Sequence, residues 1–279
     1  KPEAVGVPNL DTSVTDLRDM EDMLAFEETP TPDNPPSGDA MRAALDVAIP
    51  AYGGKASHYG AFPYMGDDVP VPKAFAIPVY YYVQHMTEHG LYTMVEGMMA
   101  DPEFQADSAV RAQQLEALQD AIKAAPIDPD FLALVHDKLS ADYPGIRMRF
   151  RSSTNAEDLD GFTGAGLYTS KSGDPSDPDK PVDAAIKKVW ASIWNYKAYD
   201  ERQYRSIDHL AVGMALLVHR SFPDEEANGV ALTGNIFDTT GLEPGFYVNV
   251  QAGEESVVLP APGVTSDQFI YHFTMPGQP

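Results

Sequence analysis

A run of arginine, hydroxyl and glycine residues near the middle of the chain has the composition of a phosphate-binding site. Arg151 and Ser152 open the segment RSSTNAEDL, and the glycine-rich segment GFTGAGLY follows at residues 161–168. Arginine offers a rigid fork of donors to an anion, hydroxyl groups add neutral donors, and glycines let backbone N–H groups come close. The pattern predicts a polyphosphate site, and its candidate ligands in the second segment are Gly161, Thr163 and Gly164.

The arginines also have a purely structural interpretation. Arg147, Arg149 and Arg151 lie shortly before Glu157 and Asp158. Pairs between such neighbouring charges are common in proteins and carry no function. Composition alone leaves both interpretations open.

A second cationic candidate lies well before the arginines, where Gly53 and Gly54 precede Lys55. The full P-loop pattern of two spaced glycines, lysine and a hydroxyl residue is absent, so this turn is a weak signal when taken alone. In a chain with few lysines, however, an ammonium group and a guanidinium fork that converge on one polyphosphate would form a clamp for ATP.

The composition narrows the class of protein. The chain has 279 residues, 42 carboxylates against 19 lysines and arginines, a net charge of -23 and no cysteine. Disulfides, thiolate catalysis and cysteine-bound zinc are therefore excluded. The acidity disfavours nucleic acid and anionic lipid as partners, and no apolar stretch reaches the roughly 18 residues of a membrane span. We expect a processed chain, because it starts at Lys1. The start at a residue other than methionine, the acidity and the lack of cysteine favour an exported setting.

The order of predicted elements indicates an α+β architecture with a helix-rich first half and a mostly antiparallel sheet in the second. We expect an acidic, proline-rich lead-in at 1–39, a first lobe at 40–211 and a second lobe at 212–279. Apolar spacing predicts helices at 14–26, 40–48, 79–89, 107–124, 130–139 and 182–205. Strands are expected at 146–150, 212–219, 229–233, 245–252 and 255–259.

Several blocks, in order along the chain, resemble the nucleotide-binding domain shared by phosphoenolpyruvate synthase, pyruvate phosphate dikinase, rifampin phosphotransferase and glucan water dikinase. One block alone would be weak, but the whole ordered set is far more specific. The glycine run GFTGAGLY is most similar to the glucan water dikinase branch. The blocks are GGK at 53–55, VPVPKAFAI at 69–77, RSSTNAEDL at 151–159, VWASIW at 189–194, GMALLVHRSF at 213–222, GVALTGN at 229–235 and GEESVV at 253–258.

This resemblance implies an ATP-grasp fold in which ATP lies between two lobes, and it favours a cytoplasmic location. By position, Lys55 with Gly54, together with Arg151, would hold the phosphates, and the loop 161–166 would close over them. Backbone groups near Val218, His219 and Arg220 would contact the adenine, although relatives usually carry glutamine at the position of His219. Thr233 and Glu254 would lie near the nucleotide on the second lobe.

The resemblance also implies Mg²⁺, because phosphoryl transfer needs a divalent metal between the phosphates. The aspartate-x-glutamate and glutamine-x-arginine blocks that supply it in the family have no counterpart before Pro279. We therefore expect an ATP-binding part of a phosphotransferase whose acceptor is unknown and which works with further domains or chains. The alternative is a non-catalytic binding or structural module that keeps this fold in an exported protein.

A competing pattern comes from another class of enzyme. His85, Glu88 and His89 match the inverted zinc-protease motif H-x-x-E-H, which sets two imidazoles one helical turn apart with a carboxylate between them. Two histidines are not the three protein ligands that catalytic zinc requires, and so short a pattern arises easily by chance. We expect these histidines to be structural.

Overall fold

The computed structural model describes residues 6–31, 33–66, 70–156, 158–159, 162–163, 166–223, 225–253, 257 and 262–272, with the backbone alone at 158 and 162–163. The chain divides into two compact units, Lys1–Ser221 and Phe222–Pro279. Each is described by itself.

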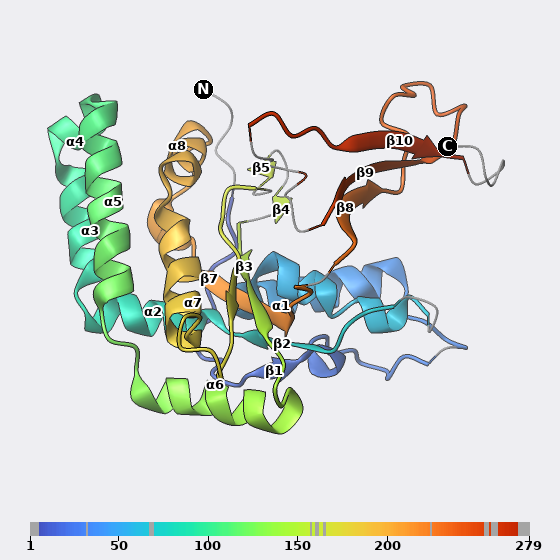
Figure 1. The fold of residues 1–279 in the computed structure, drawn as a ribbon, viewed down its shortest axis with the longest axis horizontal. Helices are drawn as coiled ribbons and strands as arrows, with labels where there is room; N and C mark the ends of the chain where they lie inside the picture. The colour runs from blue at the N-terminus through green and yellow to red at the C-terminus, as the bar shows by residue number, and fades with distance from the viewer. Residues whose placement is uncertain are drawn as a thin grey trace. The chain divides into compact units, whose positions relative to one another are not determined.

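The first unit is built on a five-stranded antiparallel sheet that joins segments far apart in the sequence (Figure 1). Strand β7 lies at its centre, paired with β2 on one side and along seven residues with β3 on the other. In spatial order the strands are β1 (Arg18–Asp19), β2 (Ala74–Ile77), β7 (Met214–Arg220), β3 (Met148–Thr154) and β6 (Lys171–Gly173).

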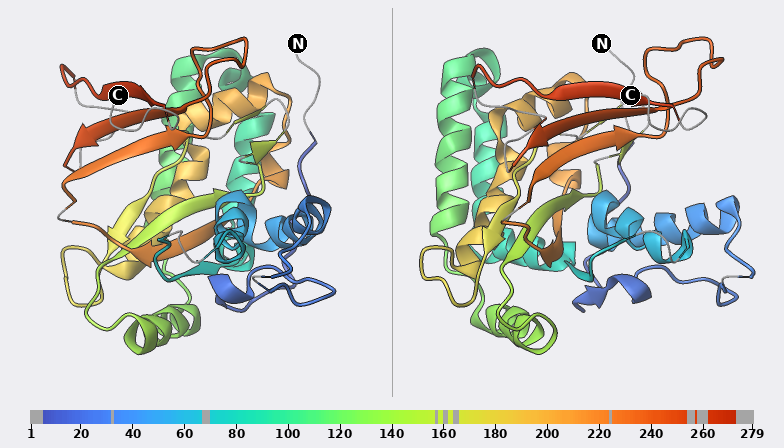
Figure 2. Two further views of the ribbon diagram at one scale, coloured as in Figure 1. Left: turned by 90° about the vertical axis from the view of Figure 1, so that its right-hand side faces the viewer. Right: turned by 45° about the vertical axis from the view of Figure 1, so that its right-hand side comes forward.

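The two faces of this sheet bury different helices, because side chains alternate along a strand. Leu217 of β7 packs with Ala76 of β2 in the core that lies under helix α1 (Gly38–Tyr59). Leu216 and Val218 point the other way, into a larger core formed with the remaining helices. Figure 2 shows α1 and α5 on opposite sides of the sheet. One face therefore belongs mainly to α1.

Three of the helices that cover the second face begin at aspartate residues that cap them. The carboxylates of Asp101, Asp107 and Asp128 each accept a backbone N–H from the first turn of a helix, as N-cap residues do. Trp190 and Trp194 are both buried in the larger core. The helices that cover this face are α2 (Val79–Glu88), α3 (Leu91–Ala100), α4 (Pro102–Ala106), α5 (Ser108–Ala124), α6 (Pro129–Asp142), α7 (Val182–Ala191) and α8 (Tyr196–Tyr204).

The single helix predicted over 182–205 is wrong. After α7 the chain forms a 3₁₀ turn at Ser192–Trp194, and Asn195 adopts an extended ψ of 139° before α8 begins. The break is held by tertiary contacts, since the Asn195 amide donates to the carbonyl of Leu167 and the Ser192 hydroxyl accepts from the N–H of Thr169. Apolar spacing continues through the break, so periodicity did not reveal it.

The helix predicted over 14–26 is also wrong. Residues 18–19 form the edge strand β1, which pairs with β2, and Met20–Asp22 form a 3₁₀ turn. The apolar spacing that favoured a helix instead marks side chains buried under α1, among them Met20 and Met23.

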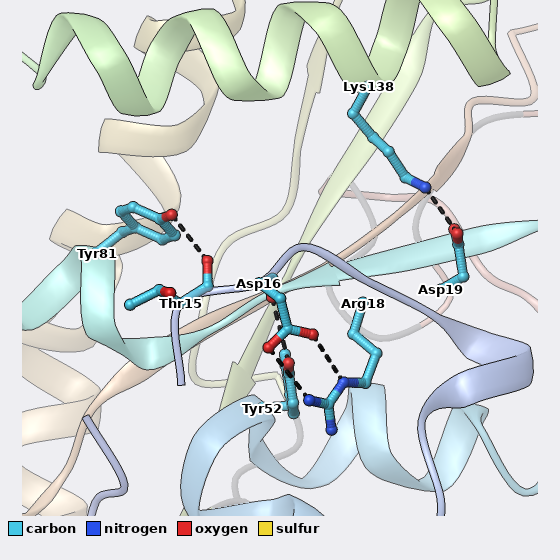
Figure 3. Close-up of polar contacts among 7 residues, drawn as sticks. All are labelled: Thr15, Asp16, Arg18, Asp19, Tyr52, Tyr81 and Lys138. Atoms are coloured by element: carbon cyan, nitrogen blue, oxygen red, sulfur yellow. Dashed lines mark hydrogen bonds and ion pairs between the residues drawn. The ribbon is translucent and has the colours of Figure 1, made fainter. Parts of the chain in front are cut away.

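This lead-in is part of the first unit rather than a linker ahead of it. Figure 3 shows its contacts with three elements: the Tyr81 hydroxyl donates to the carbonyl of Thr15 at 2.8 Å, and the Lys138 ammonium lies 2.7 Å from the Asp19 carboxylate. The Tyr52 hydroxyl donates to the carbonyl of Asp16 at 3.2 Å. These partners are far away in the sequence, so composition alone did not indicate them.

The second unit contains a three-stranded antiparallel sheet. Its order is β10 (Asp267–Tyr271), β9 (Phe246–Ala252) and β8 (Ala227–Leu232). The expected boundary at 211/212 differs from the boundary at Ser221, because β7 is bound on both edges within the first sheet. The strand expected at 255–259 lies outside the described residues.

Helices and antiparallel sheets together confirm the α+β class. A short pair of strands, β4 (Asp158–Leu159) and β5 (Phe162–Thr163), precedes β6. Among the residues that the structure describes, none of the helices is both long and apolar enough to cross a bilayer.

Candidate functional site

The site begins at a break inside α1. Gly53 has φ 72° and ψ 172°, a conformation that only glycine adopts readily. A Cβ atom at this position would lie 2.2 Å from the carbonyl oxygen of Ser153 on β3. The Ser153 hydroxyl accepts from the N–H of Ala56 at 2.9 Å and donates to the carbonyl of Tyr52 at 2.7 Å. The break in α1 is thereby locked onto β3.

This contact decides which face of the sheet the cationic residues share. Residues two apart on a strand point to the same side, so Arg149 and Arg151 share the face on which Ser153 meets α1. Lys55 follows Gly53 by two residues on that helix and is half-buried. The structure thus brings the α1 turn with Lys55 and the guanidinium of Arg151 to the same face of one sheet.

Two aromatic rings lie beside these cations. Tyr59 is four residues after Lys55, hence on the same side of α1, and its ring is parallel to that of His219 with centroids 6.4 Å apart. His219 pairs with Arg149 across the β3–β7 ladder, and Leu217 pairs with Arg151. The hydroxyl of Tyr59 donates to the carbonyl of Pro72 at 2.8 Å, which fixes the ring.

The electrostatics of the site follow from burial and clustered positive charge. Burial, with Arg151 and Arg149 nearby, lowers the pKa of His219 to about 4, despite an opposing hydrogen bond to the carbonyl of Arg220. The imidazole is therefore neutral near pH 7, and its Nδ1 donates to that carbonyl at 2.7 Å. Burial and the charge of Arg149 also lower the pKa of Arg151, while burial raises the pKa of Tyr59 to about 12.

One of the arginines lies near a carboxylate, although not one of the two neighbours considered from the sequence. Arg147 Nε lies 3.9 Å from the carboxylate of Asp174. Within the described residues Arg151 forms no ion pair with a carboxylate, whereas Glu157 and the side chain of Asp158 lie outside them. Burying a guanidinium is costly without an anion. Arg151 is thus a candidate for binding one.

Some of the other predicted residues join this face and some do not. The carbonyl of Gly54 accepts from His58 Nδ1 at 2.7 Å, which stabilises the turn before Lys55. Ser152 and Val218 are buried with their side chains on the opposite face, and Arg220 lies at the exposed end of β7. Gly161, Gly164 and Glu254 lie outside the described residues, and Thr163 is described in β5 by its backbone alone.

Thr233 belongs to the second unit. It follows β8 and lines a hollow of about 500 Å³ together with Asn235, Glu243 and Phe246. The carboxylate of Asp238 closes the loop by accepting from the Thr240 hydroxyl and from the N–H groups of Thr240 and Glu243, and these hydrogen bonds lower its pKa to about 2. The carboxylate of Asp238 is therefore engaged in hydrogen bonds within its own loop.

Sequence analysis missed two side chains that build the site, Ser153 and Tyr59. Ser153 was contained in the RSSTNAEDL block, where its role looked the same as that of Ser152. Strand alternation could have separated them, because a residue two positions from Arg151 shares its face. For Tyr59 the available signal was its i, i+4 spacing from Lys55.

The zinc-protease pattern is structural in this fold, as expected. His85 Nε2 donates to the carbonyl of Ile122 at 3.0 Å, and His89 Nε2 donates to the carbonyl of Pro126 at 2.8 Å. Glu88 accepts from the amide of Gln84. In the part of the chain that the structure describes, no three His, Asp or Glu side chains come together as metal ligands.

Comparison with known proteins gives one consistent result. Residues 49–275 match the family described as "Pyruvate phosphate dikinase, AMP/ATP-binding domain". A probable phosphoenolpyruvate synthase of Methanothermobacter thermautotrophicus is 26% identical over 193 residues, which cover 67% of this chain and 27% of that protein. The phosphoenolpyruvate synthase of Aeropyrum pernix is 24% identical over 230 residues, covering 80% of this chain and 27% of that protein.

A probable phosphoenolpyruvate synthase of Pyrococcus abyssi is 26% identical over 260 residues, covering 80% of this chain and 30% of that protein. The chain spans less than a third of the length of these relatives. Its helices and antiparallel sheets are consistent with an ATP-grasp-like nucleotide-binding domain, and the matches do not favour the alternative of a non-catalytic module. The chain belongs to the family of pyruvate phosphate dikinase AMP/ATP-binding domains.

Proposed function

We propose that this domain holds the phosphates of ATP with Lys55 and Arg151 and presents the nucleotide for phosphoryl transfer. The observation that carries the proposal is the contact between Gly53 and Ser153. It joins the helix of Lys55 to the strand of Arg151, so both cationic residues lie on one face of the sheet. Catalysis of phosphoryl transfer depends mainly on such positioning and on charge stabilisation.

The residues fit a polyphosphate. Arg151 has donors for two phosphate oxygens at once, and Lys55 adds a point charge from a different element. A bound anion would offset the repulsion and burial that now lower the pKa of Arg151. The neutral ring of His219 and the fixed ring of Tyr59 supply a flat, half-apolar wall beside the cations.

Mg²⁺ is part of the proposal only as an ion that accompanies the nucleotide. Since no three His, Asp or Glu side chains converge within the described residues, we assign it no protein ligand and derive no step through it. The phosphoryl acceptor is proposed to lie on another domain or chain, since the relatives are more than three times as long as the matched part.

Isothermal titration calorimetry tests the phosphate clamp. Lys55→Met and Arg151→Met are each expected to weaken ATP binding tenfold to a hundredfold, or about 1.5–3 kcal/mol for a charge-assisted contact. Lys123→Met is the matched control, because Lys123 pairs with Asp120 at 2.7 Å on α5, across the sheet from α1. Equal affinity in wild type and both site variants would refute the clamp. A product assay that separates AMP from ADP then distinguishes dikinase from simple kinase chemistry.

A further inference from the structure

The turn that carries Lys55 is held from a second side, by the lead-in. The carbonyl of Tyr52 accepts from Ser153 on β3, whereas the side chain of Tyr52 contacts the lead-in (Figure 3). Its hydroxyl donates to the carbonyl of Asp16 at 3.2 Å, and the guanidinium carbon of Arg18 lies 4.9 Å from the centre of its ring. Arg18 is oriented by two hydrogen bonds, from Nε and Nη2 to the carboxylate of Asp16, at 2.9 and 3.1 Å.

The lead-in is firmly attached where it makes these contacts. Arg18 lies in β1, whose backbone pairs with β2 at the edge of the sheet. Met20 and Met23 follow, and both belong to the same buried cluster as Tyr52. A Cβ atom on Gly60 would lie 2.4 Å from the Cβ of Met23, so the end of α1 packs directly against the lead-in. The lead-in can therefore act as a rigid support for this half of α1.

The break in α1 explains why the turn depends on outside support. In an unbroken α-helix the N–H of Ala56 donates to the carbonyl of Tyr52. Here the Ser153 hydroxyl stands between the two groups, accepting from one and donating to the other. A side chain inserted in this way bends a helix, and Gly53 departs from helical geometry at the same point. The direction of the segment that contains Lys55 is thus set by contacts with β3 and with the lead-in.

We propose that Asp16, Arg18 and Tyr52 form a positioning group that holds the Lys55 turn in place relative to Arg151. The inference rests on the proposed function, because it concerns the same phosphate clamp. None of the three is assigned a contact with the nucleotide. Asp16 and Arg18 precede residue 49, where the match to the family begins, so this support comes from outside the matched domain.

The test is calorimetry with ATP on the full chain, at a temperature where circular dichroism shows every variant folded. Tyr52→Phe and Arg18→Met are each expected to weaken ATP binding about threefold to tenfold. Arg18→Met leaves no buried charge behind, because the side chain of Asp16 is 54% exposed. Tyr81→Phe is the matched control: it removes a hydroxyl bond from α2 to the carbonyl of Thr15, the neighbouring residue. We expect that control to bind ATP within about twofold of wild type.

A double-mutant cycle shows whether the group acts through Lys55. Tyr52→Phe should weaken ATP binding in wild type and have almost no effect in Lys55→Met, because the ammonium group that it positions is then gone. A purely structural loss would be the same in both backgrounds. Arg18→Lys keeps a cation near the ring but loses the fork to Asp16, so its affinity should lie between those of wild type and Arg18→Met.

The outcomes separate the inference from the proposed function. If Tyr52→Phe and Arg18→Met bind ATP like wild type while Lys55→Met binds poorly, the clamp stands and the positioning group is refuted. A Tyr81→Phe protein that loses as much affinity as Tyr52→Phe, or a Tyr52→Phe effect that persists in Lys55→Met, would also overturn the inference. An absence of ATP binding by wild type would overturn the proposed function, and the inference with it.

Discussion

Replacing Gly53 with alanine tests the contact on which the site depends. The new Cβ would lie 2.2 Å from the Ser153 carbonyl oxygen and 2.7 Å from its hydroxyl. The nearest atom is a backbone oxygen, which cannot rotate away as the end of a flexible side chain can. The backbone of β3 is also held by its pairing with β7 along seven residues. Either α1 or β3 must shift, and the two hydrogen bonds of the Ser153 hydroxyl stretch with it.

The expected loss of stability is large for a single methyl group. Forcing a residue other than glycine into φ 72° and ψ 172° costs about 1–3 kcal/mol. Relief of the overlap through backbone shifts costs about 1–3 kcal/mol more. We expect the free energy of unfolding to fall by about 3–5 kcal/mol, a large part of the roughly 5–15 kcal/mol available to a domain.

Urea unfolding followed by circular dichroism measures this loss, and calorimetry with ATP measures its effect on the site. Gly97→Ala is the matched control: Gly97 lies inside α3, and a Cβ there would meet no atom within 4 Å. That control should stabilise the protein by about 0.5–1 kcal/mol. A Gly53→Ala protein within 1 kcal/mol of wild type, with unchanged ATP affinity, would contradict the proposed lock between α1 and β3.

Three further predictions concern other parts of the fold. Burial and the nearby arginines depress the pKa of His219 to about 4 in the folded state, so its contribution to stability is present above the unfolded pKa of about 6.5 and is lost as pH falls. Between pH 6.5 and 5, the free energy of unfolding of wild type should fall by about 1.5 kcal/mol more than that of His219→Gln, measured by urea unfolding. Asn155→Ala removes two bonds to the carbonyls of Pro8 and Ala211 and one from the N–H of Gly213; a loss of about 2–3 kcal/mol and faster proteolysis of the lead-in are expected, and unchanged digestion would argue against that anchor. Chelation of zinc should leave the melting temperature unchanged, because His85 and His89 donate their Nε2–H groups to backbone carbonyls; stoichiometric zinc by elemental analysis would show this assignment to be wrong.

Local signals in the sequence predicted much of the fold. The helices at 79–89, 107–124 and 130–139 and the strands at 229–233 and 245–252 agree with the structure to within a few residues. Each carries its own signal, such as an aspartate cap, a flanking proline or alternation of apolar residues. The failures at 14–26 and 182–205 share one cause, because both segments keep helical spacing while contacts with distant residues decide their backbone.

The chemical types in the candidate site were also visible in the sequence. Glycine before Lys55, and hydroxyl groups after Arg151, predicted donors for a phosphate, and the ordered blocks predicted the family that the comparison then confirmed. The individual roles of Lys55 and Arg151 stay predictions. Side-chain direction was not visible, and so Ser152 was chosen where Ser153 makes the contact with α1.

Residue order and type were enough to establish the α+β class, the family and the chemistry of the candidate groups, because capping, periodicity and ordered motifs are properties of short segments. Folding in three dimensions decided that Gly53 rests on Ser153, that Arg149 stands between His219 and Ser172, and that the lead-in joins the sheet. The physical reason is range. These pairs lie tens of residues apart, so their geometry depends on strand register and helix docking, which no local pattern encodes.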